Sequence, residues 1–347
     1  MKNRNYGIDL LRVLVTLMVI NLHLMLYGGL QERAVPLSGS YNALWMLAIA
    51  SDCAVNCFGM ISGYVSYGKR FNLKKLLRLH LTVLLYSLGI TGIVFCVEPN
   101  AVSSYDLLRS IFPITMQLYW FYSAYALAFL VMPILNWVVK NCDKRICDRI
   151  LLMVVILFSI IPTATGKDLF AINRGFSLPW MLVLFFTGMY LKKYNVELCQ
   201  NKTRLVVTYL ACVGITWFLK LGLELRSWLT YGSIMNTAML TDYCSPTILF
   251  AAVALVQLFS TLEIPNWKHR VLNRLAPLCF SVYLIHEHPL VRKILIHNCM
   301  EFAVELPPIV QPLIVITVGL LVLIMCLCID SIRMRMFQYL GIEKNIQ

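Results

Sequence analysis

The sequence predicts an all-α integral membrane protein, a single bundle of about ten transmembrane helices, from its composition, its apolar runs and the placement of its charges. Hydrophobic residues make up 59% of the 347 residues and charged residues only 14%, and the mean hydropathy is +0.73. Soluble domains contain about 45–50% apolar and about 25% charged residues. Apolar runs of bilayer-crossing length recur throughout the chain, which predicts one membrane domain over residues 1–347 and no appended soluble domain.

Length and hydropathy place ten candidate spans along the chain. They lie near residues 7–27, 43–67, 73–96, 117–139, 148–163, 176–191, 204–221, 245–262, 272–291 and 309–329. The fifth and sixth are short and lie around Pro162, Gly166 and Pro179, so their boundaries are the least sharply defined. Arg12 lies inside the first apolar run and no small-residue cleavage motif follows it, which favours a membrane helix over a secretory signal peptide.

The charges predict the orientation of these spans. The chain carries 30 Lys and Arg against 17 Asp and Glu, a net charge of +13. Most of the basic residues fall in alternate loops, and the positive-inside rule then predicts that both termini are cytoplasmic. The basic excess lies beside apolar runs rather than in a soluble module with interleaved aromatic residues. We therefore expect contact with the lipid bilayer and no nucleic-acid partner.

The first span carries the clearest polar set, Asp9, Arg12 and His23. Arg12 and His23 are separated by eleven residues, which on a helix leaves them about 20° apart in direction and about 16 Å apart along the axis. A guanidinium near the inner surface suits a phosphate-bearing donor, and an imidazole suits proton removal from a hydroxyl. Asp9 can pair with Arg12. A purely structural role fits equally, with Arg12 reaching headgroups and His23 bonding another helix.

The second span adds Asp52 at a depth comparable to that of His23, so Asp52 is predicted to orient the imidazole. Ser62 and Gly63 are small residues typical of close helix packing. Five basic residues follow this span, and they fit either a topology anchor or a phosphate site. They are Lys69, Arg70, Lys74, Lys75 and Arg78.

Two later segments combine aromatic and ionisable residues. The aromatic run 117–125 fits an interfacial belt or a platform on which sugars stack. His286, Glu287 and His288 raise the question of a metal, but neighbouring helix positions diverge and no His-Glu-x-x-His motif occurs, so no metal is expected. The twelve cysteines include no Cys-x-x-Cys motif and are interpreted as small apolar residues.

Taken in order, these motifs resemble the acyltransferase-3 family of bacterial integral membrane acyltransferases. Arg12 and His23, with ten residues between them, match the opening motif of the family. The segment 58–64 matches the family's Phe-Phe-x-x-Ser-Gly-Tyr, with Gly59 in place of the second Phe. Further matches are the basic run 74–78, Trp120-Phe121 with Pro133, Ser245-Pro246, and the segment 281–286.

The resemblance implies a membrane O-acyltransferase of the bacterial plasma membrane that moves acetyl from cytoplasmic acetyl-CoA to a hydroxyl of a cell-surface or exported glycan. It implies His23 as the catalytic base, and we place Asp52 beside it. The donor phosphates are then expected at Arg12, Lys74, Lys75 and Arg78. The expected lining of the acceptor path is Asn56, Ser62, Tyr64, Trp120, Tyr283 and His286. Whether an acyl-enzyme forms stays open.

Two other functions fit a ten-helix membrane domain. The first is a transporter or substrate-recognition module for a small molecule, which would show uptake or binding without thioester cleavage. The second is a membrane sensor, which would show no acyl turnover. Acetyl-CoA binding that is lost in Arg12→Ala would favour the enzyme.

Overall fold

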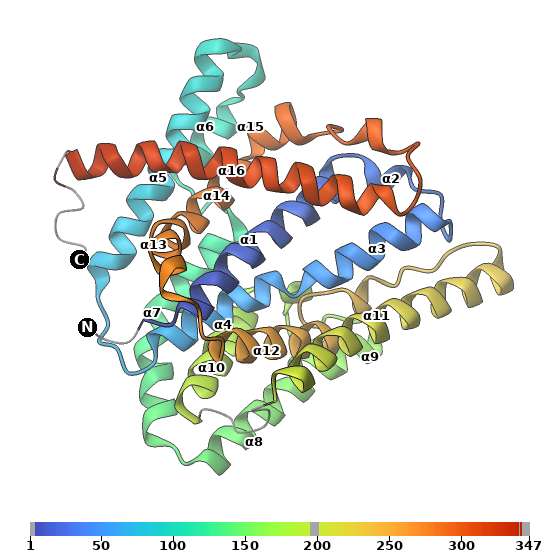
Figure 1. The fold of residues 1–347 in the computed structure, drawn as a ribbon, viewed down its shortest axis with the longest axis horizontal. Coiled ribbons are helices and arrows are strands. Elements are labelled where there is room, and N and C mark those ends of the chain that lie inside the picture. Colours follow the sequence, from blue (N-terminus) through green and yellow to red (C-terminus); the bar gives the residue numbers. More distant parts are fainter. Residues whose placement is uncertain (1–3, 195–200, 340, 342–347) are drawn as a thin grey trace.

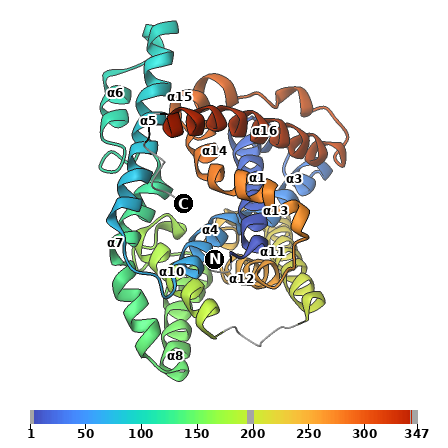
Figure 2. The same ribbon diagram turned by 60° about the vertical axis from the view of Figure 1, so that its left-hand side comes forward.

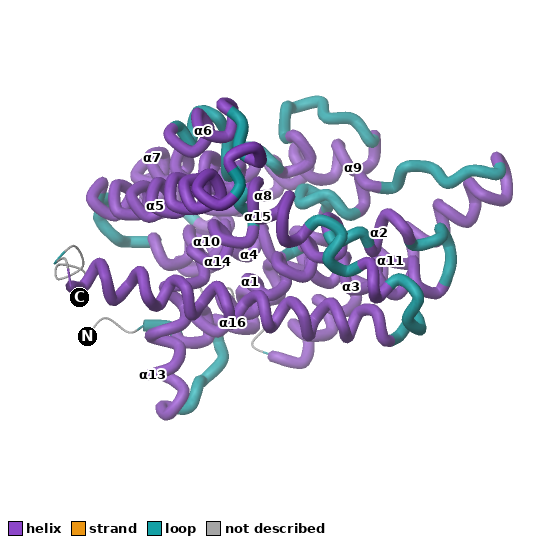
Figure 3. Tube along the Cα trace, turned by 90° about the horizontal axis from the view of Figure 1, so that it is seen from above, coloured by secondary structure: helices purple, strands orange, loops and turns teal. Residues whose placement is uncertain are grey.

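The computed structural model describes residues 4–194, 201–339 and 341. Within them the chain forms helices and loops but no strand (Figure 3), which confirms the predicted all-α class. The helices are α1 (Tyr6–Tyr27), α2 (Leu30–Arg33), α3 (Gly39–Asp52), α4 (Ala54–Ser66), α5 (Leu73–Val97), η1 (Pro99–Ala101), α6 (Ser104–Ile111), α7 (Trp120–Asn141), α8 (Lys144–Val155), η2 (Ile156–Ile160), α9 (Ile161–Thr165), η3 (Asn173–Gly175), α10 (Leu178–Tyr194), α11 (Lys202–Tyr231), η5 (Ala238–Leu240), α12 (Pro246–Ser260), α13 (Asn266–Leu275), η6 (Ala276–Leu278), α14 (Cys279–His286), α15 (Pro289–Val291), η7 (Arg292–Ile296), η8 (Glu301–Ala303) and α16 (Val310–Tyr339).

Helix α1 lies at the centre of one half of the molecule, with α3, α4, α12, α14 and α16 packed around it (Figure 2). It begins where the side chain of Asn5 accepts a hydrogen bond from the Ile8 N–H at 3.0 Å, an N-cap that satisfies a first-turn amide. At its other end the carbonyls of Tyr27 and Gly28 accept bonds from Asn298 and Met300, each at 3.0 Å. The loop after η7 therefore closes the end of α1 that carries His23.

The second predicted span forms two helices, α3 and α4, which meet at Cys53. Helix α4 packs closely on α10 through facing glycines. A Cβ on Gly63 would lie 2.0 Å from the Phe185 carbonyl oxygen, and a Cβ on Gly188 would lie 1.9 Å from that of Met60. This contact confirms the close packing predicted for the Ser62-Gly63 pair.

Two helices are about ten residues longer than predicted, and charged residues near the predicted ends are paired inside the protein. In α11, Lys220 and Glu224 are both buried and form an ion pair. In α16, Asp330 is fully buried and accepts hydrogen bonds from Tyr86 at 2.6 Å and from Arg333 at 2.5 Å. The predicted ends at 221 and 329 came from length and hydropathy, which count Glu224 and Asp330 as unfavourable in a span, whereas pairing lowers the cost of burying such charges.

The ninth predicted span, 272–291, is not one continuous helix. It consists of the end of the amphipathic helix α13, the short η6, the eight-residue α14 and the short α15. Pro277 lies in η6 and Pro289 begins α15. Proline lacks the N–H that a continuing helix needs, which explains why this segment is divided.

Seven helical stretches of the described chain are long and apolar enough to cross a bilayer. The chain is therefore a multi-pass membrane protein, while the count of ten stays a prediction. The beginning of α1 and the end of α16 lie at the same end of the bundle (Figure 1). The terminal residues 1–3 and 342–347, predicted to be cytoplasmic, lie outside the described residues.

Candidate active site

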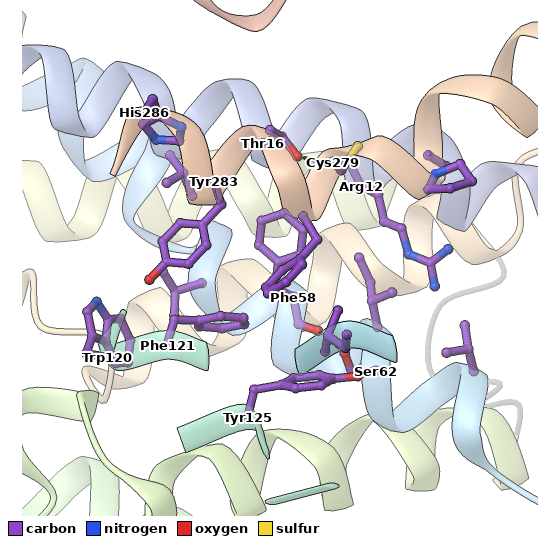
Figure 4. Close-up of a pocket in the computed structure, with 18 of the residues that line it drawn as sticks. Arg12, Thr16, Phe58, Ser62, Trp120, Phe121, Tyr125, Cys279, Tyr283 and His286 are labelled. Atoms are coloured by element: carbon purple, nitrogen blue, oxygen red, sulfur yellow. Dashed lines mark hydrogen bonds between the residues drawn. The ribbon is translucent and has the colours of Figure 1, made fainter. Parts of the chain in front are cut away.

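A cavity of about 300 Å³ lies between α1, α4 and α14 on one side and α5 and α7 on the other. Arg12 and His23 both line this cavity, as expected for two residues predicted to share one face of the first helix. Figure 4 shows Arg12 at one end of the cavity and His286 at the other, with Ser62 and Tyr125 on the wall between them. The cavity therefore extends along α1 from a guanidinium to a pair of imidazoles.

Arg12 is held by an acidic neighbour, as predicted. Its Nη1 donates to Asp9 Oδ1 at 2.7 Å, and Arg4 Nε donates to Asp9 Oδ2 at 2.5 Å. The Asp9 side chain is only 3% exposed, while that of Arg12 is 27% exposed. Asp9 thus fixes one side of the Arg12 guanidinium and leaves donors of that group directed toward the cavity (Figure 4).

A smaller cavity of about 230 Å³ adjoins this end and shares four lining residues with the first, Val65, Ser66, Leu79 and Tyr125. Its polar wall is basic, and consists of Lys69, Arg70, Asn72 and Lys75. Lys75 was predicted to bind the donor, whereas Lys74 and Arg78 do not line either cavity. Lys69 and Arg70 line the smaller cavity together with Lys75.

His23 has two close partners, both at the end of α14. Its Nδ1 lies 3.0 Å from His286 Nε2 and 3.0 Å from Glu287 Oε2. The His23 and Glu287 side chains are 15% and 9% exposed. A carboxylate and a second imidazole therefore converge on one nitrogen of His23.

These contacts determine which His23 nitrogen carries the proton. His286 Nδ1 lies 2.6 Å from the Val282 carbonyl oxygen, which can only accept, so His286 Nδ1 is the donor. A neutral His286 then presents Nε2 as an acceptor, and Glu287 is an acceptor as well. His23 therefore donates to His286 from Nδ1, while Glu287 Oε2 lies within ion-pair distance of the same nitrogen without a hydrogen bond. Its Nε2 therefore keeps a free lone pair, the form that a general base needs.

Glu287 is itself anchored. Its Oε1 accepts from Arg292 Nη1 at 2.8 Å, and the same nitrogen donates to the Tyr27 hydroxyl at 3.0 Å. The Arg292 guanidinium also lies over the Tyr27 ring, 4.3 Å from its centroid, which is a cation–π contact. Arg292 begins the π-helical turn η7, a feature often found at functional sites.

Asp52 does not contact His23, and the prediction that it orients the imidazole is wrong. The carboxylate on His23 is Glu287. Asp52 is the last residue of α3, and Cys53 separates it from α4. The Oδ2 atom of Asp52 is buried without a hydrogen-bond partner among the described residues. Its electrostatic neighbours are Asp242 and Arg174. Similar depth in the membrane did not imply proximity, because α3 directs this side chain toward the loops around 174 and 242.

Aromatic residues form much of the remaining wall. Tyr283 lies edge-on to Phe121, with 5.9 Å between ring centroids, and to His286, with 6.3 Å. Its hydroxyl is buried, and no residue in the described part of the chain bonds to it. Trp120 stacks on Tyr243 at 6.0 Å and 18°. Trp120, Tyr283 and His286 thus line the cavity as predicted.

The nucleophile candidates in the wall include the Ser62 hydroxyl and the Cys279 thiol, and each donates to a carbonyl four residues earlier in the chain. Ser62 Oγ donates to the Phe58 carbonyl at 2.9 Å, and Cys279 Sγ donates to that of Leu275 at 3.6 Å. Within the described chain neither is hydrogen-bonded to a histidine. An activated nucleophile needs a neighbouring base, so these contacts favour direct attack by an external hydroxyl.

Two residues predicted to line the acceptor path lie behind the wall. Asn56 is fully buried, donates to the Tyr243 carbonyl at 2.7 Å and accepts from Trp180 Nε1 at 3.0 Å. Tyr64 packs toward α10, with Lys192 Nζ 4.7 Å from its ring centroid. Asn56 therefore positions Tyr243, which does line the cavity, and Tyr64 belongs to the packing of α4 on α10.

The acyltransferase-3 family model, described as an acyltransferase domain, matches residues 5–333. The chain belongs to the acyltransferase-3 family. No curated protein and no solved structure matches it. The protein is therefore a multi-pass membrane acyltransferase, and its activity requires an acyl donor and an acceptor.

The acyltransferase also contains functional candidates that sequence reasoning did not assign. Glu287 and Arg292 complete the His23 cluster, and Glu287 had been considered only as a metal ligand. The available signal was its position next to His286 in a motif of the family. In the described ranges, no three His, Cys, Asp or Glu side chains are arranged to hold a metal ion.

Proposed function

We propose that this acyltransferase transfers acetyl from cytoplasmic acetyl-CoA to a hydroxyl of a cell-surface or exported glycan. It would act in the bacterial plasma membrane with both termini cytoplasmic. The observation that carries the proposal is the single cavity lined by Arg12 at one end and His23 at the other. That separation matches a reaction whose donor and acceptor arrive from opposite sides of a bilayer.

The donor is proposed to enter at the basic end. Lys69, Arg70 and Lys75 line the adjoining cavity, and Arg12 lies where the two cavities approach. Phosphate oxygens bind well to guanidinium and ammonium groups. The slender pantetheine arm would then extend along the apolar wall of α4 and α14 toward His23.

The chemical step is proposed to be direct transfer. His23 Nε2 removes the proton from the acceptor hydroxyl while the oxygen attacks the thioester carbonyl carbon. Tyr283, whose hydroxyl has no partner among the described residues, donates a hydrogen bond to the oxyanion that develops. Collapse of this intermediate breaks the C–S bond, and the imidazolium returns its proton to the thiolate. Glu287 stabilises the imidazolium between these two transfers.

Purified protein tests the proposal with acetyl-CoA and unacylated glycan from cells that lack the gene. We expect release of the CoA thiol and acetyl on the glycan by mass spectrometry. His23→Ala lowers the transfer rate at least about 100-fold. His297→Ala, which removes an exposed histidine of the loop after η7, serves as the matched control. Near wild-type transfer by His23→Ala would contradict the proposal, and uptake without thioester cleavage would favour a transporter.

A further inference from the structure

A second, polar cavity of about 380 Å³ lies beside the loops 166–177 and 232–245. These loops follow the ends of α9 and α11, away from the end of the bundle where α1 begins (Figure 1). In the proposed orientation the cavity therefore opens on the outer side of the membrane. It is separate from the cavity that contains His23.

The wall of this second cavity contains balanced charges. Its cations are Lys167 and Arg174, and its carboxylates are Asp168 and Asp242. Arg174 Nε donates to Asp242 Oδ1 at 2.6 Å, and Asp168 accepts from the backbone N–H groups of residues 172 and 173 at 2.7 and 2.8 Å. A wall with paired charges and many donors and acceptors suits a neutral polyhydroxylated ligand better than a single ion.

A buried polar atom in the wall of this cavity lacks a hydrogen-bond partner among the described residues. Thr163 lines the cavity, and its Oγ1 is buried with no hydrogen bond to the described part of the protein. Asp52 Oδ2 is in the same situation, and Asp242 and Arg174 are its electrostatic neighbours. Buried polar groups normally have a hydrogen-bond partner. Of these two residues only Thr163 lines the cavity, so its unpaired oxygen is the one that points to a bound ligand or solvent.

The loop that forms this wall is held in a conformation unfavourable for its residues. Ala171, Asn173 and Arg174 all have φ between 48° and 57°, a region that residues with a Cβ seldom adopt. Gly175 follows with φ of 96°, and a Cβ there would lie 2.6 Å from Tyr243 Cβ. Strain of this kind persists where the surroundings enforce it and gathers at ligand sites.

One short segment separates the two cavities. Asp242 and Cys244 line the second cavity, while Tyr243 between them lines the cavity of His23. Tyr243 stacks on Trp120 and also contacts Phe176, with 4.8 Å between ring centroids. A sugar chain bound in the second cavity would meet this aromatic group on its way to His23, and aromatic faces are suitable surfaces for sugar rings.

We propose that the second cavity binds a neutral, hydroxyl-rich sugar unit of the acceptor, next to the unit that is acylated. Asp242, Arg174, Lys167 and Thr163 hydrogen-bond its hydroxyls, and Tyr243 directs the neighbouring unit toward His23. The inference rests on the proposed function, because it takes the acceptor to be a glycan. The site then contributes to acceptor affinity and has no part in the thioester chemistry.

Kinetics with two substrates test the inference, using acetyl-CoA and the unacylated glycan from cells that lack the gene. Arg174→Gln and Asp242→Asn are expected to lower kcat/KM for the glycan about 10- to 100-fold, the effect of losing a hydrogen bond to a charged group. The KM for acetyl-CoA stays at its wild-type value. Arg226→Gln, an exposed charge on α11 that does not line the cavity, is the matched control.

Unchanged glycan kinetics in both variants would overturn the inference while leaving the proposed function intact. If instead the wild type transfers no acetyl, the proposed function itself fails. Should Arg174→Gln or Asp242→Asn not fold, Lys167→Gln replaces them, because the Lys167 side chain is exposed and makes no described bond that supports the fold. A Lys167→Gln protein with wild-type KM for the glycan would then count against the site.

Discussion

Arg12 and His23 lie on the same helix, yet their acidic partners come from different parts of the chain. Asp9 precedes Arg12 by one turn of α1, whereas Glu287 follows α14 and reaches His23 through the fold. Helical spacing was enough to predict the first pair. It could not predict the second, because 264 residues separate the partners and the ninth span is divided by prolines. Asp52 was wrongly given the role of Glu287 for the same reason.

Glu287→Gln tests the charge beside His23. The amide preserves the size of the side chain but no longer stabilises an imidazolium, so the transfer rate should fall at least about 100-fold. Initial rates of acetyl transfer under saturating acetyl-CoA measure this. Glu301→Gln, which alters only the surface pair with Arg33, should keep the wild-type rate. A Glu287→Gln enzyme with full activity would show that His23 does not need this carboxylate.

Tyr283→Phe tests the proposed oxyanion donor. The variant removes one buried hydroxyl that has no partner in the described structure, so folding should be preserved. Loss of a single donor to an oxyanion lowers kcat by about 10²–10³-fold, and KM for acetyl-CoA should stay constant. Tyr105→Phe, at an exposed position, is the control. The role is refuted by an unchanged kcat.

The helices follow the sequence pattern where apolar runs are continuous and depart from it where charges are paired. The cores of the spans at α1, α5 and α7 match their predicted positions. The ends of α11 and α16 were placed too early, because hydropathy treats a buried ion pair as two exposed charges. Such pairing depends on contacts between helices distant in sequence, which a local pattern does not contain.

The α4–α10 contact offers a test of packing. Gly188→Ala would place a Cβ 1.9 Å from the Met60 carbonyl oxygen, so the two helices must move apart. We expect a loss of about 1–3 kcal/mol of stability, visible as a lower midpoint of thermal unfolding in detergent, with reduced transfer because α4 lines the cavity. Gly214→Ala on α11 has no atom within 4 Å of the new Cβ. That control should retain the wild-type midpoint, and an equal shift in both variants would contradict the packing account.

At the scale of the whole molecule, two adjoining cavities place a basic group of side chains at the Arg12 end and His23 at the other end. The basic loops predicted the orientation, and the matching ends of α1 and α16 agree with an even number of crossings (Figure 1). The sequence also indicated which α1 residues would share the cavity. It could not indicate the second cavity beside Tyr243, because that space is formed by two loops whose backbone conformations have no periodic signal.

Sealed membrane vesicles of opposite orientation test the central claim, that acetyl passes from one side of the membrane to the other along this cavity. Labelled acetyl-CoA is added outside inverted vesicles, which expose the cytoplasmic face and enclose the glycan. The label should appear on the enclosed glycan, and this signal should be lost in His23→Ala. Right-side-out vesicles should label glycan only when acetyl-CoA is loaded inside them. Labelling of external glycan by external acetyl-CoA on intact right-side-out vesicles would contradict the account.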